Sequence, residues 1–393
     1  MPLLEKWALS RGTMGRKFAE VNNRLLILGV HLKSEGYPNV LYRLQDLTNT
    51  HAFDITEINQ PMWRSLATPR GTIGAGLQNA IRAVWVHLTV LYQYLRAPPA
   101  RWVYVPYPAV FLLFLLGLLP HRLRPRWIVV DAFISIYDTV VHDRQLLAAR
   151  GLSARLLHWV ERQAYRVADK IVVDTPQNAD YLCEIFDLPA ARVVSIPLST
   201  NETAFFPVTR AAHPEFCNVL FVGTLIPLHG IAYIVDAMTR LSHRRDIRFK
   251  IIGDGQDSAK VAAALAHPDI QLTWTRSWQS SAQLAAEIGQ ADICLGIFGE
   301  GAKTQRVCPF KIYAYTAMGR ATITGDTRWV SASGHAAAFA LVPVGDGARL
   351  ALAIENLVDH PDTRATLAIA GRGFYQAHLG NQIALSKILQ CFT

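Results

Sequence analysis

Two loops in the second half of the chain have the composition of an anion-binding site. Residues 221–238 read as a strand ending in Gly223, a loop that contains Thr224 and His229, and a helix that begins after Gly230. Backbone N–H groups and the helix dipole at such a junction favour negative charge. The His229 imidazole adds a group that would hold a phosphate better when protonated, whereas Thr224 brings no charge. We therefore expect an anion at this loop.

A second glycine-containing loop, within residues 296–327, supplies positive charge. Lys303 and Arg306 lie in the loop, and Lys311 lies at the start of a helix that Gly319 is expected to end. A cation at a helix N-terminus opposes the helix dipole unless an anion lies nearby, which favours a role in anion binding. The alternative is that these three side chains are ordinary solvated surface charge.

Apolar, β-branched segments alternate with amphipathic ones along nearly the whole chain, which predicts parallel, doubly wound α/β sheets. The first set of predicted strands comprises residues 25–30, 102–105, 127–131, 170–174 and 192–196. The second set comprises residues 218–223, 248–253, 269–272, 292–297, 321–325 and 339–342. The irregular stretch 197–218, which contains several prolines, separates the two sets. We expect two Rossmann-like domains, with ligands in the cleft between the carboxyl ends of their strands.

Two common nucleotide-binding motifs are missing from this framework. No G-x-G-x-x-G loop follows the first predicted strand, the glycines of GTIGAG at 71–76 stand in another order, and IIGDGQD at 251–257 lacks the third glycine. The P-loop pattern is also absent from the sequence. These absences disfavour an NAD-dependent oxidoreductase and a P-loop NTPase.

Length and charge bound the remaining possibilities. The chain has 393 residues, enough for two or three domains, and its hydrophobic content of 51% excludes a disordered chain. The net charge is +9, and residues 1–150 carry seventeen basic and nine acidic side chains, a net +8. Such asymmetry indicates an anionic partner of the first half, whether a phosphorylated substrate, a nucleic acid or an acidic membrane. Solvated surface charge is the alternative.

Targeting signals are weak. The five cysteines form no C-x-x-C pair, and residues 1–23 lack the apolar core of a signal peptide, so we expect a reducing, cytoplasmic location. The longest apolar run, residues 109–119, is shorter than the roughly 18 residues that a membrane-spanning helix needs. It reads as a buried helix between two strands or, since arginines follow it, as a short interfacial anchor.

Together the motifs resemble those of retaining glycosyltransferases of family 4, which have the GT-B fold of two Rossmann-like domains facing a cleft. The resemblance rests on IPLHG at 226–230, on GIFG and the basic loop that follows at 296–311, on DAFISIYDTVVHDR at 131–144 and on GYPN at 36–39. Residues 341–375 also resemble the end of the family's second domain.

The resemblance implies a division of the chain into three parts. An acceptor-binding Rossmann-like domain would span 1–205 and a nucleotide-sugar-binding one 206–375. Residues 376–393 would form a C-terminal helix that packs back on the N-terminal domain.

It also implies an activity. A sugar would pass from a nucleotide-diphosphate sugar, the co-substrate, to a glycan or lipid-linked acceptor with retention of its anomeric configuration, in bacterial surface-glycan or glycolipid biosynthesis. No metal or other cofactor and no nucleic acid would be needed, because helix N-termini and basic side chains can stabilise the leaving diphosphate. The expected location is the cytoplasm, at or near the inner face of the cell membrane.

Roles for individual residues follow from the same resemblance. The donor diphosphate would lie against Gly223, Thr224, His229, Gly230, Lys303, Arg306 and Lys311. The nucleoside would lie against Gly253, Asp254, Gly255 and Arg276, and the acceptor near Gly36, Tyr37 and Asp138. Asp131, at a strand end, and Glu300, in the loop after GIFG, are the catalytic candidates. Capping of a helix or an ion pair, for instance with Arg144, is the alternative for Asp138.

The chain departs from the family at four of these positions. Thr224 and His229 stand where the family has the arginine and lysine that hold the donor phosphates. Arg306 and Ala314 stand where it has two glutamates, one facing the donor sugar and one the ribose. Losing a charged hydrogen bond to a ligand costs about 1.5–3 kcal/mol. A degenerate relative that binds without catalysis is therefore the alternative function.

The segment 71–101 has a sequence pattern that indicates the kind of acceptor. Apolar side chains recur there at helical spacing with arginines beside them: Ile81, Trp85, Leu88, Leu91, Tyr92 and Leu95. With the charge of the first half, this pattern favours a lipid-linked acceptor and an anionic membrane surface as partners. Packing of the stripe into the core is the alternative.

Overall fold

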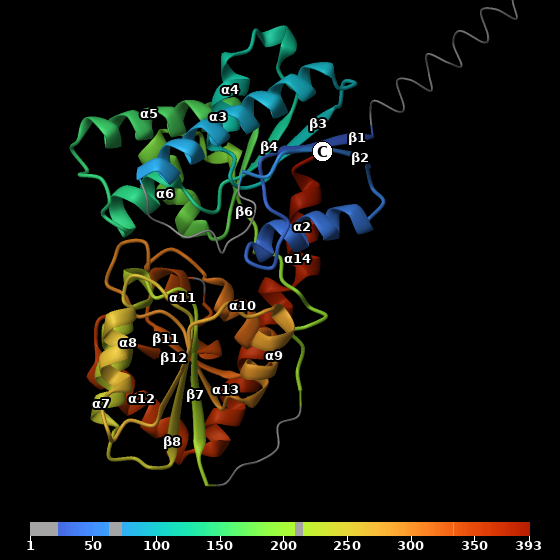
Figure 1. Ribbon diagram of the computed structural model, residues 1–393. Helices are drawn as coiled ribbons and strands as arrows, with labels where there is room; N and C mark the ends of the chain where they lie inside the picture. Colours follow the sequence, from blue (N-terminus) through green and yellow to red (C-terminus); the bar gives the residue numbers. More distant parts are fainter. Residues whose placement is uncertain (1–22, 63–72, 209–214, 333) are drawn as a thin grey trace, which may run out of the picture.

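The computed structural model describes residues 23–62, 73–208, 215–332 and 334–393, and Figure 1 shows them as two domains joined by two connections. The strands are β1 (Arg24–Gly29), β2 (Asp54–Asn59), β3 (Trp102–Val105), β4 (Ile128–Asp131), β5 (Lys170–Val173), β6 (Val193–Ser195), β7 (Cys217–Val222), β8 (Ile247–Ile252), β9 (Leu272–Thr275), β10 (Ile293–Leu295), β11 (Ala321–Gly325) and β12 (Ala340–Val342). The helices are α2 (Pro38–Asn49), α3 (Ile73–Arg96), α4 (Val110–Leu118), α5 (Leu152–Val167), α6 (Pro176–Phe186), α7 (Ile231–Arg240), α8 (Ser258–Leu265), α9 (Ser281–Gln290), α10 (Phe310–Ala317), α11 (Arg328–Ala332), α12 (Gly347–Asp359), α13 (Pro361–Phe374) and α14 (Asn381–Gln390).

The strands form two six-stranded parallel sheets, one in each domain. The first has the order β2-β1-β3-β4-β5-β6 and the second β12-β11-β10-β7-β8-β9. Both orders reverse direction beside the first strand of the set, which is the topological switch point of a Rossmann-like sheet. The predicted α/β class and the two facing Rossmann-like domains are thus confirmed.

Each sheet is covered by helices on both faces. In the N-terminal domain, α3, α4, α5 and α6 pack on one face, while α2 and α14 pack on the other. In the C-terminal domain, α7, α8 and α12 cover one face and α9, α10 and α13 the other. Continuous apolar strands such as Leu25–Leu28 follow from this double coverage, because every side chain in them is buried.

Local signals fix several helix starts. At the start of α9, the Ser280 side chain accepts from the Gln283 backbone while the Gln283 side chain accepts from the Ser280 backbone, which is a capping box. Thr175 caps α6, and Pro176 occupies its first turn, where a missing N–H is tolerated. These short-range patterns fix where α6 and α9 begin after the carboxyl ends of the preceding strands.

Two strands differ from the predicted ones, and both lie at sheet edges. The edge strand β2 was not predicted, because its sequence DITEIN is polar and its residues are exposed or half-buried. The edge strand β9 begins three residues later than the segment 269–272 suggested. An edge strand is covered less than a central one, so its apolar pattern is weaker.

The apolar segment 109–119 is the helix α4, which packs its inner side into the N-terminal core. Leu112, Leu113 and Leu116 are fully buried, which confirms the prediction of a buried helix, whereas Phe111 and Leu118 are exposed on the outer side. Within the described residues, none of the helices combines the length and apolar character needed to cross a membrane.

The last helix joins the two domains. Ala384 and Ile388 of α14 pack with Leu25 and Ile27 of β1, and the Trp127 indole donates to the Cys391 carbonyl at 2.9 Å. Figure 1 shows α14 crossing from the lower domain to the upper one. The cleft is therefore bounded by two crossings of the chain, at residues 197–204 and at the start of α14.

Candidate active site

The loop after β7 packs so closely that only glycine fits at its two ends. Gly223 has φ +148° and Gly230 has φ +67°. A Cβ on Gly230 would lie 2.6 Å from the Phe298 carbonyl carbon, and a Cβ on Gly223 would lie 2.8 Å from the Lys311 amine. The loop is thus locked against the strand end after β10, and the first turn of α10 lies over Gly223.

Lys311 is the most unusual side chain of this loop cluster. It is 6% exposed, and among the described residues its amine has no hydrogen-bond partner. The amine lies 3.9 Å from the centre of the Phe221 ring. Burial holds the pKa of Lys311 well below its ordinary value. A buried amine without a partner is costly, so this arrangement is suited to meet an anion.

His229 faces the same point, but not as the phosphate donor that the sequence suggested. Its Nδ1–H donates to the Thr224 carbonyl, so the neutral ring presents Nε2 as an acceptor. Burial, and next the nearby Lys311, hold the pKa of His229 well below its ordinary value. Burial therefore disfavours the charged imidazole, and the expectation that His229 holds a phosphate better when protonated stays a prediction. An anion between Lys311 and His229 would raise the pKa of both groups.

A cavity of about 220 Å³ adjoins these residues. Its wall is mainly apolar and includes Phe205, Val222, Leu284, Ile288, Phe310 and Ala314. The Tyr315 hydroxyl lies in the same wall and accepts from the Val222 backbone N–H at 2.9 Å. Among the described residues, no carboxylate lines this cavity. Ala314 thus leaves an apolar surface beside the loop that precedes α7.

Lys303 and Arg306, the other predicted phosphate ligands, reach from the C-terminal domain to Asp138 of the N-terminal domain instead. Arg306 contacts both oxygens of Asp138, at 2.5 and 3.3 Å, and stacks 3.6 Å from the centre of the Tyr181 ring. The Lys303 amine lies 3.4 Å from Asp138 and donates to Thr139 Oγ1 at 2.9 Å. Asp138 is 2% exposed. The ion pair suggested for Asp138 is therefore with these two cations of the C-terminal domain, not with Arg144.

The turn after β8 lies against the anion-binding loop. Gly253 has φ +140°, and a Cβ there would lie 2.0 Å from the Gly223 carbonyl oxygen. Asp254 is exposed and pairs with Arg276 at 2.9 Å. Hydrogen bonds from Ser258 and then from Arg276 lower the pKa of Asp254. The structure thus brings the predicted nucleoside residues Gly253, Asp254, Gly255 and Arg276 together beside Gly223, at one end of the cleft.

Glu300 lies at the rim of the same loop cluster. Its carboxylate is exposed and accepts from the Tyr233 hydroxyl of α7. The neighbouring Gly299 is packed so closely that a Cβ there would lie 2.3 Å from the Pro227 carbonyl oxygen. Glu300 is therefore held next to the 226–230 loop.

Asp131 is placed differently from the other predicted site residues. It ends β4 and is 1% exposed, and its Oδ2 accepts from Asn39 at 3.0 Å, from Arg43 at 3.2 Å and from Tyr104 at 3.2 Å. Arg43 also donates to the Pro197 carbonyl at 2.6 Å, where the first domain crossing begins. The carboxylate thus ties α2 and the crossing to the sheet rather than opening into the cleft.

We predict that Asp131→Asn lowers the free energy of unfolding by about 2 kcal/mol, because the buried Arg43 loses its charged partner. Urea unfolding measures this loss. Asp54→Asn, which removes an exposed partner of Arg24 at 3.4 Å, is the matched control and should change stability by less than about 0.5 kcal/mol. Loss of sugar transfer with unchanged stability would instead assign Asp131 to the chemistry.

The acceptor side of the cleft is aromatic. Tyr37 precedes α2, its ring lies 6.1 Å from that of Tyr107, and Tyr107 lies 5.2 Å from Phe133. These rings follow β1, β3 and β4, so the carboxyl ends of three neighbouring strands carry one aromatic cluster beside Gly36. Tyr107 and Phe133 were not predicted as site residues, although an aromatic residue placed just after a predicted strand end is a usable signal.

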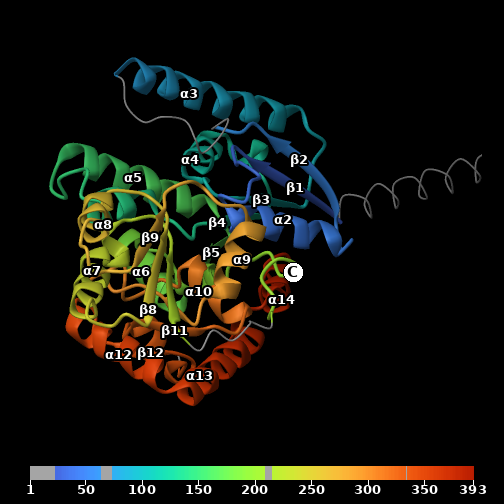
Figure 2. The same cartoon turned by 60° about the horizontal axis from the view of Figure 1, so that its bottom comes forward.

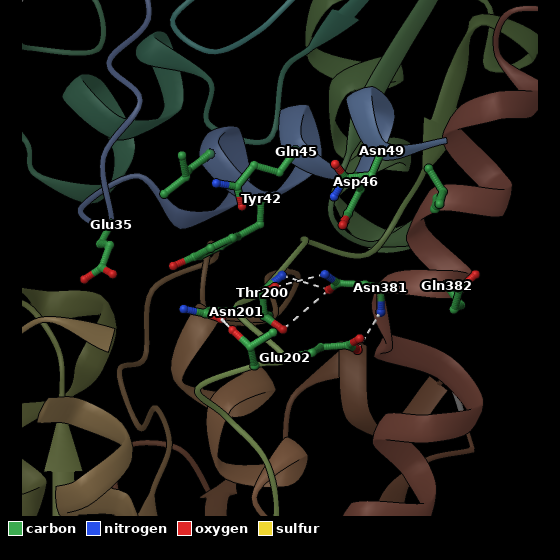
Figure 3. Close-up of a pocket in the computed structure, with 13 residues that line it drawn as sticks. Glu35, Tyr42, Gln45, Asp46, Asn49, Thr200, Asn201, Glu202, Asn381 and Gln382 are labelled. Atoms are coloured by element: carbon green, nitrogen blue, oxygen red, sulfur yellow. Dashed lines mark hydrogen bonds between the residues drawn. The ribbon is translucent and has the colours of Figure 1, made fainter. Parts of the chain in front are cut away.

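A polar pocket of about 480 Å³ lies at the domain crossings, between α2, residues 200–203 and the start of α14 (Figure 3). Asn381 donates from Nδ2 to the Thr200 carbonyl and accepts from the Thr200 N–H, both at 2.9 Å. Asp46 lies on the α2 side of the pocket and Glu202 on the other. Burial raises the pKa of Asp46 from its ordinary 3.8 to about 6, and Glu202 adds to the rise.

A raised carboxyl pKa makes the folded state lose stability as pH rises from 3.8 to about 6, because the unfolded chain releases the proton first. We predict that Asp46→Asn raises the melting temperature above pH 6 and leaves it unchanged below pH 3.8. The gain is below about 1 kcal/mol, since Asp46 is half-buried and screened. Asp180→Asn, on an exposed position of α6, should leave the pH profile unchanged; equal profiles for both variants would contradict the assignment.

Comparisons with known proteins agree with this geometry. The family profile described as "Glycosyl transferase 4-like domain" matches residues 21–199, and the one described as "Glycosyl transferases group 1" matches residues 217–360. No curated protein sequence matches the chain significantly. Within the described residues no group of three or more histidine, cysteine or carboxylate side chains could hold a metal ion.

Solved structures share the architecture at low sequence identity. Sucrose-phosphate synthase from Thermosynechococcus elongatus matches with a TM-score of 0.70 and 15% identity over 94% of this chain and 98% of its own. WaaG, a glycosyltransferase involved in lipopolysaccharide biosynthesis, matches with 0.65 and 12% over 94% and 99%. Anabaena HepE, solved in complex with UDP, matches with 0.63 and 11% over 93% and 98%. The two family profiles and this architecture identify the chain as a glycosyltransferase of the GT-B fold.

Proposed function

We propose that the chain transfers a sugar from a nucleotide-diphosphate donor to a glycan or lipid-linked acceptor with retention of configuration. The observation that carries this proposal is the buried, unpartnered amine of Lys311 beside the backbone of Gly223. A diphosphate placed there meets the amine and the backbone of the loop before α7, two sources of positive potential in a low-dielectric site. The same charges stabilise the diphosphate as it leaves, and they do so without a metal ion.

The other site residues contact the nucleoside and sugar of the donor, and the acceptor. The nucleoside lies along Gly253 and Gly255, and the sugar lies toward Glu300, whose carboxylate at the loop rim can accept from its hydroxyls. The acceptor enters over the aromatic cluster of Tyr37, Tyr107 and Phe133. In a front-face transfer the leaving phosphate takes the acceptor proton, so no dedicated carboxylate base is required, in keeping with the burial of Asp131.

A panel of UDP, GDP and ADP in a thermal-shift assay tests the donor class. A ligand at a hundred times its dissociation constant adds about 2.7 kcal/mol of stability. We expect one nucleotide diphosphate to raise the melting temperature selectively. No shift with any nucleotide would contradict the donor site.

A second candidate function is a glycan- or lipid-binding relative without catalysis. The observation that favours it is the apolar wall at Ala314, which offers no carboxylate to donor hydroxyls. An activity assay distinguishes the two candidates. It uses a sugar conjugate of the nucleotide that the panel selects, and it measures whether the sugar is released or transferred. Nucleotide binding without any turnover on membrane extracts would support the second.

The proposed setting is the cytoplasmic side of a bacterial membrane, in the assembly of surface polysaccharides or glycolipids. Support comes from the likeness to WaaG, which is involved in lipopolysaccharide biosynthesis, and from the basic first half of the chain.

A further inference from the structure

The outer side of α3 carries an exposed apolar row. Val86 and Val90 are buried against the sheet, while Trp85 is 63% exposed, Leu88 51% and Tyr92 54%. Ile81, Val84 and Leu95 extend this row and are also exposed. Figure 2 shows α3 as the outermost helix of the N-terminal domain. The amphipathic helix predicted from the sequence thus packs one side into the core, and no described residue covers its other apolar side.

The row continues onto the two neighbouring helices. Phe111 of α4 lies 6.1 Å from the His87 ring of α3, and Trp159 of α5 lies 5.7 Å from the Phe114 ring of α4. Phe111, Leu118, Leu152, Leu156 and Trp159 are all exposed. Exposed apolar side chains gathered on three adjacent helices are typical of an interaction or membrane surface.

The charge of this face has one sign. Residues 73–167 contain eleven arginines and four carboxylates. Asp131, Asp138 and Glu161 are at most 2% exposed, and the Asp143 side chain is 6% exposed near Lys303. The carboxylates are thus turned inward, so the outer surface of this part of the chain carries only positive charge.

A groove of about 1020 Å³ at the amino ends of β3 and β4 joins this face to a cluster of arginines. Arg101, Arg122 and Arg126 line it. The Arg101 guanidinium lies 4.5 Å from the centre of the Trp102 ring, and no described carboxylate pairs with any of the three. Arg124, in contrast, donates to the Leu119 and Gly117 carbonyls and so closes the end of α4. Leu95 belongs both to the groove and to the exposed row of α3.

We propose that this arginine groove binds the phosphate headgroups of anionic phospholipids while the outer row of α3, α4 and α5 enters the apolar edge of the bilayer. The inference rests on the proposed function only in that a lipid-linked acceptor places the enzyme at a membrane. Guanidinium groups without a described carboxylate partner, next to exposed aromatic and aliphatic side chains, are suited to bind an anionic membrane surface. A second copy of the chain is disfavoured as the occupant of this face, because it would bring two basic faces together. Residues 1–22 are disfavoured for the same reason, since they carry four basic and two acidic side chains.

Vesicle flotation with the full chain tests the proposal. The vesicles are pure phosphatidylcholine or contain about a third phosphatidylglycerol, at about 0.1 M and about 1 M NaCl, where the Debye length falls from about 10 Å to about 3 Å. We expect binding to the anionic vesicles only, weakened by salt. The groove variant Arg101→Gln/Arg122→Gln/Arg126→Gln should bind on the order of a hundredfold more weakly, since each arginine near such a surface contributes roughly fivefold.

The matched control is Arg240→Gln/Arg245→Gln/Arg349→Gln, which removes the same charge from exposed positions of the C-terminal domain and should bind like the wild type. Trp85→Ser/Leu88→Ser should also weaken binding, with the residual binding more sensitive to salt. Equal binding by the groove and control variants would overturn the proposal. So would a dimer, seen by light scattering, that Trp85→Ser/Leu88→Ser dissolves.

Nucleotide-induced stabilisation separates this inference from the proposed function. The groove lies at the amino ends of the strands, away from the anion-binding loop, so the groove variant should keep the thermal shift with the selected nucleotide. Vesicle binding without any nucleotide shift would contradict the donor site alone, and a nucleotide shift without vesicle binding would contradict the membrane site alone.

Discussion

Lys311→Met should raise the free energy of unfolding and at the same time weaken nucleotide binding. Methionine matches the length of the lysine stem and leaves no polar atom without a partner in the apolar cavity beside Phe221. We expect a gain of about 1–3 kcal/mol in stability, the cost of burying an unsatisfied polar group. The affinity for the nucleotide diphosphate should fall about ten- to a hundredfold, because a charged hydrogen bond of about 1.5–3 kcal/mol is lost.

The gain in stability should depend on pH with a defined sign. The pKa of Lys311 is lower in the folded chain than in the unfolded one, so the wild type becomes more stable as pH rises toward the ordinary pKa of lysine. The advantage of Lys311→Met should therefore shrink between neutral and strongly alkaline pH. Urea unfolding across this range measures it.

Lys250→Met is the matched control for this variant. Lys250 lies in the same domain and pairs with Glu287 at 2.6 Å, with a side chain that is 33% exposed. Its replacement should lower stability slightly and leave nucleotide binding intact. If Lys311→Met destabilises the chain and keeps wild-type affinity, Lys311 is a structural residue and the anion-binding account is wrong.

Asp138→Ala should lower the free energy of unfolding by about 3–5 kcal/mol. The change leaves two cations of the C-terminal domain, Arg306 and Lys303, facing a buried surface without their carboxylate. Since these contacts join the two domains, the cleft should also open, which small-angle X-ray scattering would record as a larger radius of gyration.

Asp187→Asn provides the comparison on the surface, because asparagine removes the charge and tolerates the left-handed backbone of this position, φ +52°. Asp187 also meets two arginines, Arg162 at 2.5 Å and Arg166 at 3.4 Å, but its side chain is 77% exposed. Its loss should cost less than about 1 kcal/mol and leave the scattering profile unchanged. Equal losses for both variants would show that the Asp138 contact does not hold the domains together.

Local patterns in the sequence were enough to predict the two sheets and the glycine-bounded loop between β7 and α7, whereas anion binding by that loop stays a prediction. Strands buried on both faces read as continuous apolar runs, and a loop that must turn at Gly223 and Gly230 needs glycine for steric reasons. The strands that were missed or shifted, β2 and β9, lie at sheet edges, where half of the apolar signal is absent.

The partners of charged side chains could not be predicted in the same way. Asp138 meets Arg306 across 168 positions of sequence, and Asp131 meets Arg43 across 88. Nothing in the local sequence distinguishes a lysine that binds a ligand from one that binds the other domain. Lys303 lies in the glycine-containing loop and Lys311 directly follows it. Of these two lysines, only Lys311 has an amine without a hydrogen-bond partner among the described residues.

Burial also changed the chemistry expected of single groups. His229 looked like a cation for a phosphate, but its buried ring is held neutral and directs Nδ1 to the Thr224 carbonyl. Asp131 looked like a residue of the cleft because it ends a strand, but the donors of α2 and β3 enclose it. Such effects depend on neighbours from distant segments, which only the folded chain brings together.

Calorimetric titration of the selected nucleotide diphosphate, in two buffers of different ionisation enthalpy, tests the central claim most directly. A diphosphate beside Lys311 and His229 raises the pKa of both groups, so binding should take up protons and should tighten as pH falls. The uptake should be reduced or absent in Lys311→Met. Binding of wild-type strength in that variant, or binding without proton uptake in the wild type, would contradict the account.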